Sequence, residues 1–172
     1  ARHDGHDYVE KAKMAGAVAV VVDQPVVCQL PTVLVASVRK PMPYIAGEIA
    51  GNPSHHLKVV GITGTNGKTS TVRMIEAILK RAGISAGSID TISARFGGEE
   101  EPSRLTTPES VDLQRMLSRM ERAGVDHVAL PEQDKCVDFM NVYGDVSDFV
   151  ELRYEISDQS TVCIKYLVVR PC

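Results

Sequence analysis

A ten-residue stretch near the middle of the chain combines residue types that bind phosphate. Residues 61–70 read GITGTNGKTS and join an apolar run at 57–62 to an amphipathic stretch that begins near Thr69. Gly64 and Gly67 allow tight turns in which consecutive N–H groups surround an anion, and a helix start adds positive potential. The sequence therefore predicts a strand, a phosphate-binding loop and a helix.

Two side chains at the predicted helix start extend this chemistry. Lys68 supplies a mobile positive charge, and the Thr69 hydroxyl stands where a magnesium ion that bridges terminal phosphates takes an oxygen ligand. A glycine turn could also join a strand to a helix without any ligand. A Lys-Thr pair at the helix start has no packing role, however, so we expect a nucleoside triphosphate site.

The loop departs from the standard P-loop pattern, which has glycine where this chain has Ile62. Residues 63–69 read TGTNGKT, and in this the chain resembles the Mur ligases and the folylpolyglutamate synthetases. The resemblance implies a catalytic role for Lys68 and Thr69, with Thr69 also bound to Mg²⁺. The implied ATP-binding residues are Gly64, Thr65, Asn66, Gly67, Lys68, Thr69 and Ser70.

A second motif, LTTPES at 105–110, precedes a helical pattern of apolar residues at 111–120. Thr107 could cap that helix with Pro108 in its first position, or Thr106 could form a capping box with Glu109. Hydroxyls and free N–H groups at a helix start could equally hold a carboxylate or phosphate of a substrate. From the residues alone, helix capping and substrate binding are equally favoured roles for the two threonines.

The spacing of this second motif after the loop is similar to that of the Mur ligase that adds the third residue, diaminopimelate or lysine, to the muramyl peptide. The resemblance implies that Thr106 and Thr107 bind UDP-muramyl dipeptide. Residues 4–8, DGHDY, and 15–17, AGA, resemble the end of the uridine-nucleotide-binding domain of Mur ligases.

These patterns predict an α/β fold: a three-layer P-loop domain with a mainly parallel sheet, preceded by a partial smaller α/β domain. A turn-rich break at 51–54 sets the expected boundary. We expect a helix at 68–82, a strand at 85–89, a hairpin or loop at 95–102, and strands in the tail at 161–169 and, more weakly, at 137–142. The expected domains are 1–52, the partial N-terminal uridine-nucleotide-binding domain; 53–130, the front of a central ATP-binding domain; and 131–172, an unassigned tail, possibly β.

The resemblance becomes weaker after Leu130. Family members continue with Glu-Val-Ser-Ser-His, whose glutamate helps to bind magnesium, but this chain has Pro131 at that place. Glu132 comes one residue late, which in a strand directs a side chain to the opposite face. We therefore expect a truncated chain that is inactive alone.

The histidines and cysteines add little specificity. His6 could lie near a nucleotide substrate or satisfy a turn after Asp4, and we favour the turn. His55 and His56 are adjacent in a linker and so cannot form a metal pair on one helix face. The four cysteines lack paired metal spacing and are expected to be free thiols.

Composition narrows the class of protein. The chain has 172 residues, 44% of them hydrophobic, and a net charge of −3, which suits a globular protein with a core. It has no basic run, so we expect no nucleic acid partner, and no apolar segment for a membrane or a signal peptide. We expect a cytoplasmic protein; no pattern defines its oligomeric state.

The resemblance implies an ATP-dependent acid–amino-acid ligase of peptidoglycan precursor synthesis. ATP would phosphorylate the D-glutamate carboxylate of UDP-N-acetylmuramyl-L-alanyl-D-glutamate, and an amino acid would then attack the acyl phosphate. Two alternatives remain open. One is a nucleotide-binding or interaction module without turnover, and the other is a ligase of the folylpolyglutamate or cyanophycin type.

Overall fold

The computed structural model describes residues 4–62, 66–102, 109–131, 149–155 and 161–167. The chain forms two compact units, Ala1–Met42 and Pro43–Cys172. Each unit has its own sheet and is described by itself. Within the described ranges, no helix combines the length and hydropathy needed to cross a lipid bilayer.

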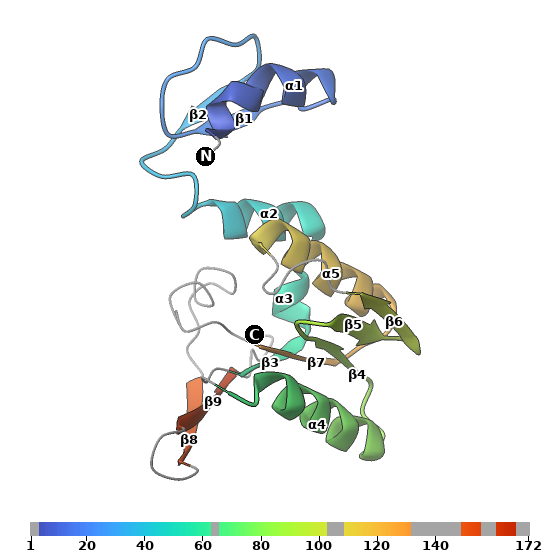
Figure 1. Ribbon diagram of the computed structural model, residues 1–172. Helices are drawn as coiled ribbons and strands as arrows, with labels where there is room; N and C mark the ends of the chain where they lie inside the picture. Colours follow the sequence, from blue (N-terminus) through green and yellow to red (C-terminus); the bar gives the residue numbers. More distant parts are fainter. Residues whose placement is uncertain (1–3, 63–65, 103–108, 132–148, 156–160, 168–172) are drawn as a thin grey trace. The chain divides into compact units, whose positions relative to one another are not determined.

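The first unit pairs short helices with a parallel two-stranded sheet (Figure 1). Its elements are η1 (Gly5–Tyr8), α1 (Val9–Met14), β1 (Val20–Val22) and β2 (Thr32–Leu34). Gly16, with φ 95°, lets the chain leave α1. Among the hydrophobic residues described in this unit, only Val22 is buried, so its core is small. Cys28 is a free thiol, as predicted.

The second unit is built on a five-stranded sheet in the order β3-β7-β4-β5-β6. Its strands are β3 (Lys58–Ile62), β4 (Ala86–Ile89), β5 (Ser93–Phe96), β6 (Glu99–Pro102) and β7 (His127–Pro131). Its helices are α2 (Met42–Ala50), α3 (Pro53–His56), α4 (Lys68–Arg81) and α5 (Ser110–Arg122). The α/β class is confirmed.

The sheet is mixed, and the expectation of a mainly parallel sheet is corrected. Strands β3, β7 and β4 are parallel, whereas β4, β5 and β6 pair antiparallel. The reason is two tight turns: one between β4 and β5, where the Asp90 N–H donates to the Ser93 carbonyl at 2.8 Å, and one between β5 and β6, where Gly97 and Gly98 have φ of 59° and 86°. A two-residue turn with positive φ at both positions forms a tight hairpin, which reverses the strand direction.

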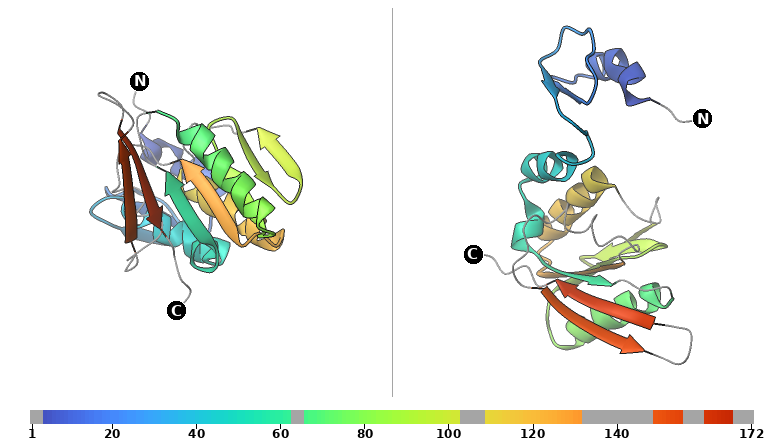
Figure 2. Two further views of the ribbon diagram at one scale, coloured as in Figure 1. Left: turned by 90° about the horizontal axis from the view of Figure 1, so that it is seen from below. Right: turned by 90° about the vertical axis from the view of Figure 1, so that its left-hand side faces the viewer.

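Side chains alternate along the parallel strands and form a core on each face of the sheet. On one face, Val59 and Val128 belong to the cluster that contains Leu117 and Met120 of α5. On the opposite face, the neighbouring strand residues pack with α4; they are Val60, Ile62 and Ala129, against Val72 and Ile75. Figures 1 and 2 show α5 and α4 on opposite sides of the sheet.

The end of α2 and the start of α3 are tied to α5 by two hydrogen bonds. The Ser118 hydroxyl donates to the Ala50 carbonyl at 3.1 Å, and the Gln114 amide donates to the Ser54 hydroxyl at 3.2 Å. The compact units therefore divide between Met42 and Pro43, ten residues before the boundary that we expected after Asn52. Part of the expected break at 51–54 is helical, because α3 begins at Pro53.

Helix α4 and strand β4 lie where the sequence predicted them, but the start of α5 does not. The N-cap residue of α5 is Glu109, whose backbone is extended and whose side chain makes no capping hydrogen bond. The predicted cap at Thr107, with Pro108 in the first position, is therefore wrong, as is a capping box that begins at Thr106. Both threonines lie outside the described residues.

The described part of the tail is a hairpin of β8 (Phe149–Glu155) and β9 (Thr161–Leu167), which pair antiparallel from Phe149 opposite Leu167 to Glu155 opposite Thr161. Strand β9 lies within the strand expected at 161–169. The weaker strand candidate at 137–142 lies outside the described residues.

Candidate nucleotide-binding site

The candidate site lies between the end of β3 and the start of α4. Strand β3 ends at Ile62, and α4 begins at Lys68 after a left-handed N-cap residue, Gly67, with φ 79°. Only glycine adopts this conformation without strain, which explains the second glycine of the motif. Gly67 has no side chain, so the N-cap residue itself makes no side-chain hydrogen bond to the first turn of the helix.

The predicted ATP-binding residues around the helix start differ in exposure. Asn66, Gly67 and Ser70 are exposed, whereas Lys68 and Thr69 are half-buried. The Thr71 hydroxyl donates to the Gly67 carbonyl at 2.9 Å and stabilises the first turn. Gly64 and Thr65, the first two of the predicted set, lie outside the described residues.

Parallel strands bring further groups to the same edge of the sheet. The carboxyl ends of β3, β7 and β4 meet there, which is where ligands bind in open α/β sheets. Pro131 lies opposite Ile62 in the strand register, beside the start of the loop. Pro131 therefore occupies the strand position where the resemblance led us to expect a glutamate, and Glu132 lies outside the described residues.

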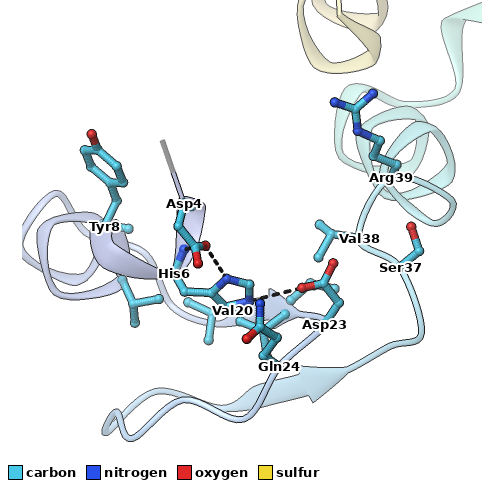
Figure 3. Close-up of a pocket in the computed structure, with 14 residues that line it drawn as sticks. Asp4, His6, Tyr8, Val20, Asp23, Gln24, Ser37, Val38 and Arg39 are labelled. Atoms are coloured by element: carbon cyan, nitrogen blue, oxygen red, sulfur yellow. Dashed lines mark hydrogen bonds and ion pairs between the residues drawn. The ribbon is translucent and has the colours of Figure 1, made fainter. Parts of the chain in front are cut away.

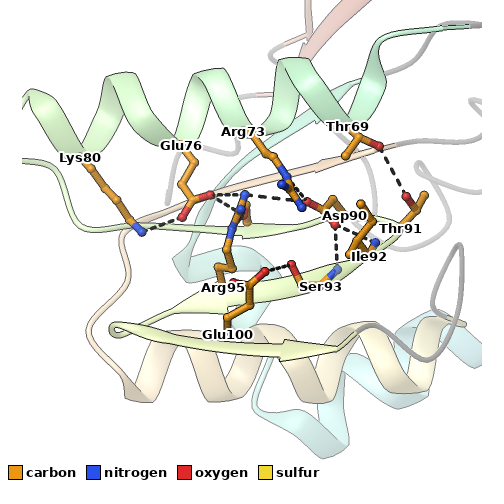
Figure 4. Close-up of polar contacts among 11 residues, drawn as sticks. Thr69, Arg73, Glu76, Lys80, Asp90, Thr91, Ile92, Ser93, Arg95 and Glu100 are labelled. Carbon is orange, nitrogen blue, oxygen red and sulfur yellow. Dashed lines mark hydrogen bonds and ion pairs between the residues drawn. The ribbon is translucent and has the colours of Figure 1, made fainter.

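A polar network between α4 and the β4–β5 segment supports the helix start (Figure 4). Glu76 is buried and accepts from Lys80 at 2.6 Å and from the Ser88 hydroxyl at 2.7 Å; Arg95 pairs with it at 2.7 Å. Sequence reasoning missed this network, because its partners lie on separate elements. The signal available was the presence of polar residues on α4 at intervals of three and four.

Asp90, directly after β4, is the second buried carboxylate of the network. It accepts from Arg73 Nε at 2.9 Å and from the backbone N–H groups of Ile92 and Ser93. Burial by itself would raise the pKa of Asp90, but these hydrogen bonds outweigh it and lower the pKa below its ordinary value. Asp90 is therefore a stable anion at neutral pH.

The same balance applies to Glu76. Burial would raise its pKa, but the hydrogen bonds from Lys80 and Ser88 and the charges of Lys80 and Arg95 lower it. Both buried carboxylates of the network are therefore paired with basic side chains of the same unit.

The run of glutamates at 99–101 is only partly a solvated surface. Glu99 and Glu100 are exposed on β6, but Glu100 accepts from the buried Ser93 hydroxyl at 2.6 Å. Glu101 pairs with Arg119 of α5. Two of the three glutamates therefore tie β6 to its neighbours.

The first unit contains a separate hollow of about 1010 Å³, lined by η1, β1 and the segment around Arg39 (Figure 3). His6 lies in it between two carboxylates: Nδ1 is 2.6 Å from Asp4, and Nε2 is 3.2 Å from Asp23. The hydrogen bond to Asp4 and the neighbouring negative charges raise the pKa of His6, although burial opposes this. His6 thus satisfies the predicted turn at Asp4 and also lines a pocket.

Comparison with known proteins agrees with the arrangement of the second unit. Residues 62–131 match the model of the Mur ligase middle domain. Residues 62–131 of this chain belong to the Mur ligase family. Their match begins at the last residue of β3 and ends with β7, so this Mur ligase segment contains α4, α5 and the polar network.

Two relatives that share one name match more of the chain than the family model does. The UDP-N-acetylmuramoyl-L-alanyl-D-glutamate–2,6-diaminopimelate ligase of Geobacillus kaustophilus is 38% identical over 158 residues, covering 90% of this chain and 32% of that protein. That of Geobacter metallireducens is 42% identical over 154 residues, covering 87% and 30%. The chain thus spans about a third of the length of these Mur ligases.

The similarity extends beyond the part of the chain that we expected. Residues 1–130 are 130 of 172, or about 76%, so an alignment that covers 90% must include part of the tail. A solved structure of an enzyme of the same name has a TM-score of 0.67, with 20% identity, over 81% of this chain and 28% of that one. This likeness shows that the fold is shared.

The described residues could bind a magnesium ion only together with the phosphates of a nucleotide. The described residues contain no group of three or more His, Cys, Asp or Glu that could hold a metal ion. His56, for example, pairs with Glu121 at 2.7 Å. What this Mur ligase segment offers is the hydroxyl of Thr69, a hard oxygen ligand that Mg²⁺ accepts when phosphates supply most of its charge.

Proposed function

We propose that this chain carries the ATP-binding front part of a Mur ligase that joins an amino acid to UDP-N-acetylmuramyl-L-alanyl-D-glutamate in peptidoglycan precursor synthesis. The observation that carries the proposal is the TGTNGKT sequence at the end of a parallel strand, with Gly67 left-handed and α4 beginning at Lys68. The family match over the same segment supports it.

Each predicted site residue has a role in this proposal. The loop from Gly64 to Ser70 binds the ATP phosphates, Lys68 neutralises charge on the transferred group, and Thr69 also binds Mg²⁺. Bound Mg²⁺ would offset charge that develops on the phosphate oxygens. Thr106 and Thr107 bind the muramyl dipeptide.

The reaction proposed for the whole ligase has two steps. The γ-phosphoryl group of ATP passes to the free carboxylate of the D-glutamate, which gives an acyl phosphate and ADP. The amine nitrogen then attacks the acyl carbon, the C–O bond to phosphate breaks, and the amine proton is lost as the amide forms. Because the relatives are named for 2,6-diaminopimelate, we propose that compound as the amine.

The finer domain assignment belongs to the same proposal. We assign residues 53–130 to a three-layer P-loop domain and residues 1–52 to a partial uridine-nucleotide-binding domain, whose ligand would use the hollow lined by His6 and Asp23. We also propose that the activity is cytoplasmic, because its substrates would be ATP and a UDP-linked sugar peptide.

A second candidate function is ATP binding without turnover. It is favoured by Pro131, which lies opposite Ile62 in the strand register, at the position where the resemblance led us to expect a magnesium-binding glutamate. A binding assay followed by an assay for ADP release separates the two functions.

The first test is calorimetric titration of the purified chain with ATP in the presence of Mg²⁺. We expect measurable binding that is at least about tenfold weaker in Lys68→Ala, because a charged hydrogen bond contributes roughly 1.5–3 kcal/mol. Arg81→Ala, in the exposed last turn of the same helix, is the matched control and should bind like the unmodified chain. No binding by the unmodified chain would contradict the proposal.

Titration with UDP-N-acetylmuramyl-L-alanyl-D-glutamate then separates this ligase from the folylpolyglutamate and cyanophycin types. A saturable heat signal supports the muramyl substrate. Binding of ATP without any binding of the muramyl dipeptide would favour one of the other ligases or a nucleotide-binding module.

A further inference from the structure

One side of α4 carries a row of polar side chains that face the β4–β5 segment (Figure 4). The row consists of Thr69, Arg73, Glu76 and Lys80, at intervals of four, three and four residues, which places them on one helix face. Arg73 and Glu76 hold the central part of this contact through Asp90 and Arg95. The row therefore fixes the start of α4 relative to the turn that follows β4.

That turn is held tightly by Asp90. The Asp90 side chain is fully buried; its Oδ1 atom accepts from the N–H groups of Ile92 at 2.7 Å and Ser93 at 2.8 Å. The Asp90 N–H in turn donates to the Ser93 carbonyl at 2.8 Å. Arg73 from α4 binds the other oxygen, Oδ2, at 2.9 Å. The residue between these bonded positions, Thr91, thus has a fixed backbone.

The side chain of Thr91 extends toward the start of α4. Its Oγ1 atom is 3.5 Å from Oγ1 of Thr69, the residue that follows Lys68. Thr91 is exposed, so its hydroxyl is not there to satisfy a buried group, and packing would accept a valine equally well. Two hydroxyls from separate elements therefore meet at the proposed phosphate and magnesium end of the site.

We propose that Thr91 is a further binding residue for the Mg²⁺-bound triphosphate, with Asp90 and Arg73 as positioning residues that hold it beside Thr69. The inference rests on the proposed function. Its physical basis is that Mg²⁺ retains several waters when it binds phosphates, and these waters need acceptors from the protein. The Thr91 hydroxyl supplies one such acceptor beside Thr69, the proposed protein ligand of the Mg²⁺ ion.

The test is calorimetric titration with ATP at a series of Mg²⁺ concentrations, for the unmodified chain and for Thr91→Val. Valine keeps the shape of threonine and removes the hydroxyl. We expect the Mg²⁺ concentration for half-maximal ATP affinity to rise about tenfold, the usual effect of removing a group that orients metal ligands. Thr91→Ser, which restores a hydroxyl, should recover most of the loss.

Two measurements separate binding from folding. Thermal unfolding of each variant without nucleotide should give the same midpoint, because Thr91 is exposed. Ile92→Val, a change to the neighbouring exposed side chain that keeps the N–H group bonded to Asp90, should leave the Mg²⁺ requirement unchanged.

The outcomes distinguish this inference from the function on which it rests. If the unmodified chain binds ATP and Thr91→Val has the same Mg²⁺ requirement, the role of Thr91 is wrong and the proposed function stands. If the unmodified chain binds no ATP at any Mg²⁺ concentration, both are overturned. A tenfold shift that Thr91→Ser reverses supports both.

Discussion

At the scale of single residues, the buried carboxylates are the most sensitive points of the second unit. Glu76 has a 7% exposed side chain and accepts from two groups while it pairs with Arg95. Removal of its charge would leave Arg95, 20% exposed, with a weaker contact to Asp90 at 3.8 Å. A buried ion pair need not stabilise a protein, but removal of one partner usually destabilises it.

We therefore expect Glu76→Gln to reduce the free energy of unfolding by about 1–3 kcal/mol, measured by urea denaturation at pH 7. Lys80→Met removes the half-exposed partner of the same carboxylate and should cost less than about 1 kcal/mol. Equal effects of the two substitutions would show that burial does not determine the contribution of this network.

The lowered pKa values of Glu76 and Asp90 also predict how the stability of the second unit depends on pH. The pKa values of Glu76 and Asp90 lie below their ordinary values of 4.5 and 3.8, so the unfolded chain takes up protons first as the pH falls. The stabilisation is fully present above about pH 5 and is lost as the pH falls through 4.5 and below. Glu76→Gln should flatten this decline; an unchanged pH profile would contradict the assigned shift of Glu76.

At the scale of elements, α5 is held to the sheet by large apolar side chains that meet a small strand residue. Met120 is fully buried in the core, and its Sδ atom would lie 3.3 Å from a Cβ added at Gly87 of β4. The Arg95 carbonyl would lie 3.1 Å from the same Cβ. Gly87 is therefore the residue that lets α5 and β5 approach β4 closely.

Met120→Ala should reduce the free energy of unfolding by about 2–5 kcal/mol, because it removes buried methylenes and leaves a cavity. Met74→Ala on α4, where the side chain is 63% exposed, is the matched control and should change stability by less than about 0.5 kcal/mol. Chemical denaturation of both variants measures the difference. Similar losses at the two sites would mean that α5 does not pack as described.

At the scale of the whole chain, the two compact units differ in the size of their cores. Val22 is the only buried hydrophobic side chain described in the first unit, whereas the second unit has two clusters on opposite faces of its sheet. Local opening requires less free energy where fewer apolar contacts are broken.

Hydrogen exchange followed by mass spectrometry should therefore show faster exchange of backbone amides in β1 and β2 than in β3 and β7. The comparison is internal, because all four strands belong to one chain and have parallel partners. Equal protection of the two sheets would indicate that the first unit is stabilised as strongly as the second.

The sequence by itself determined the parts of this protein that depend on neighbouring residues. The pattern at 68–82 predicted a helix, the pattern at 95–102 indicated a hairpin or loop, and TGTNGKT indicated a turn that joins a strand to a helix. These features are local, since turn conformations and helix faces are set by residues a few positions apart.

Only the tertiary structure decided which distant residues meet. The start of α5 at Ser110, the mixed strand order and the attachment of α2 to α5 depend on packing between segments far apart in the chain. The contact between Thr69 and Thr91 likewise joins two elements 22 residues apart. No local pattern encodes such a contact, because it exists only once Arg73 and Asp90 have fixed one element against the other.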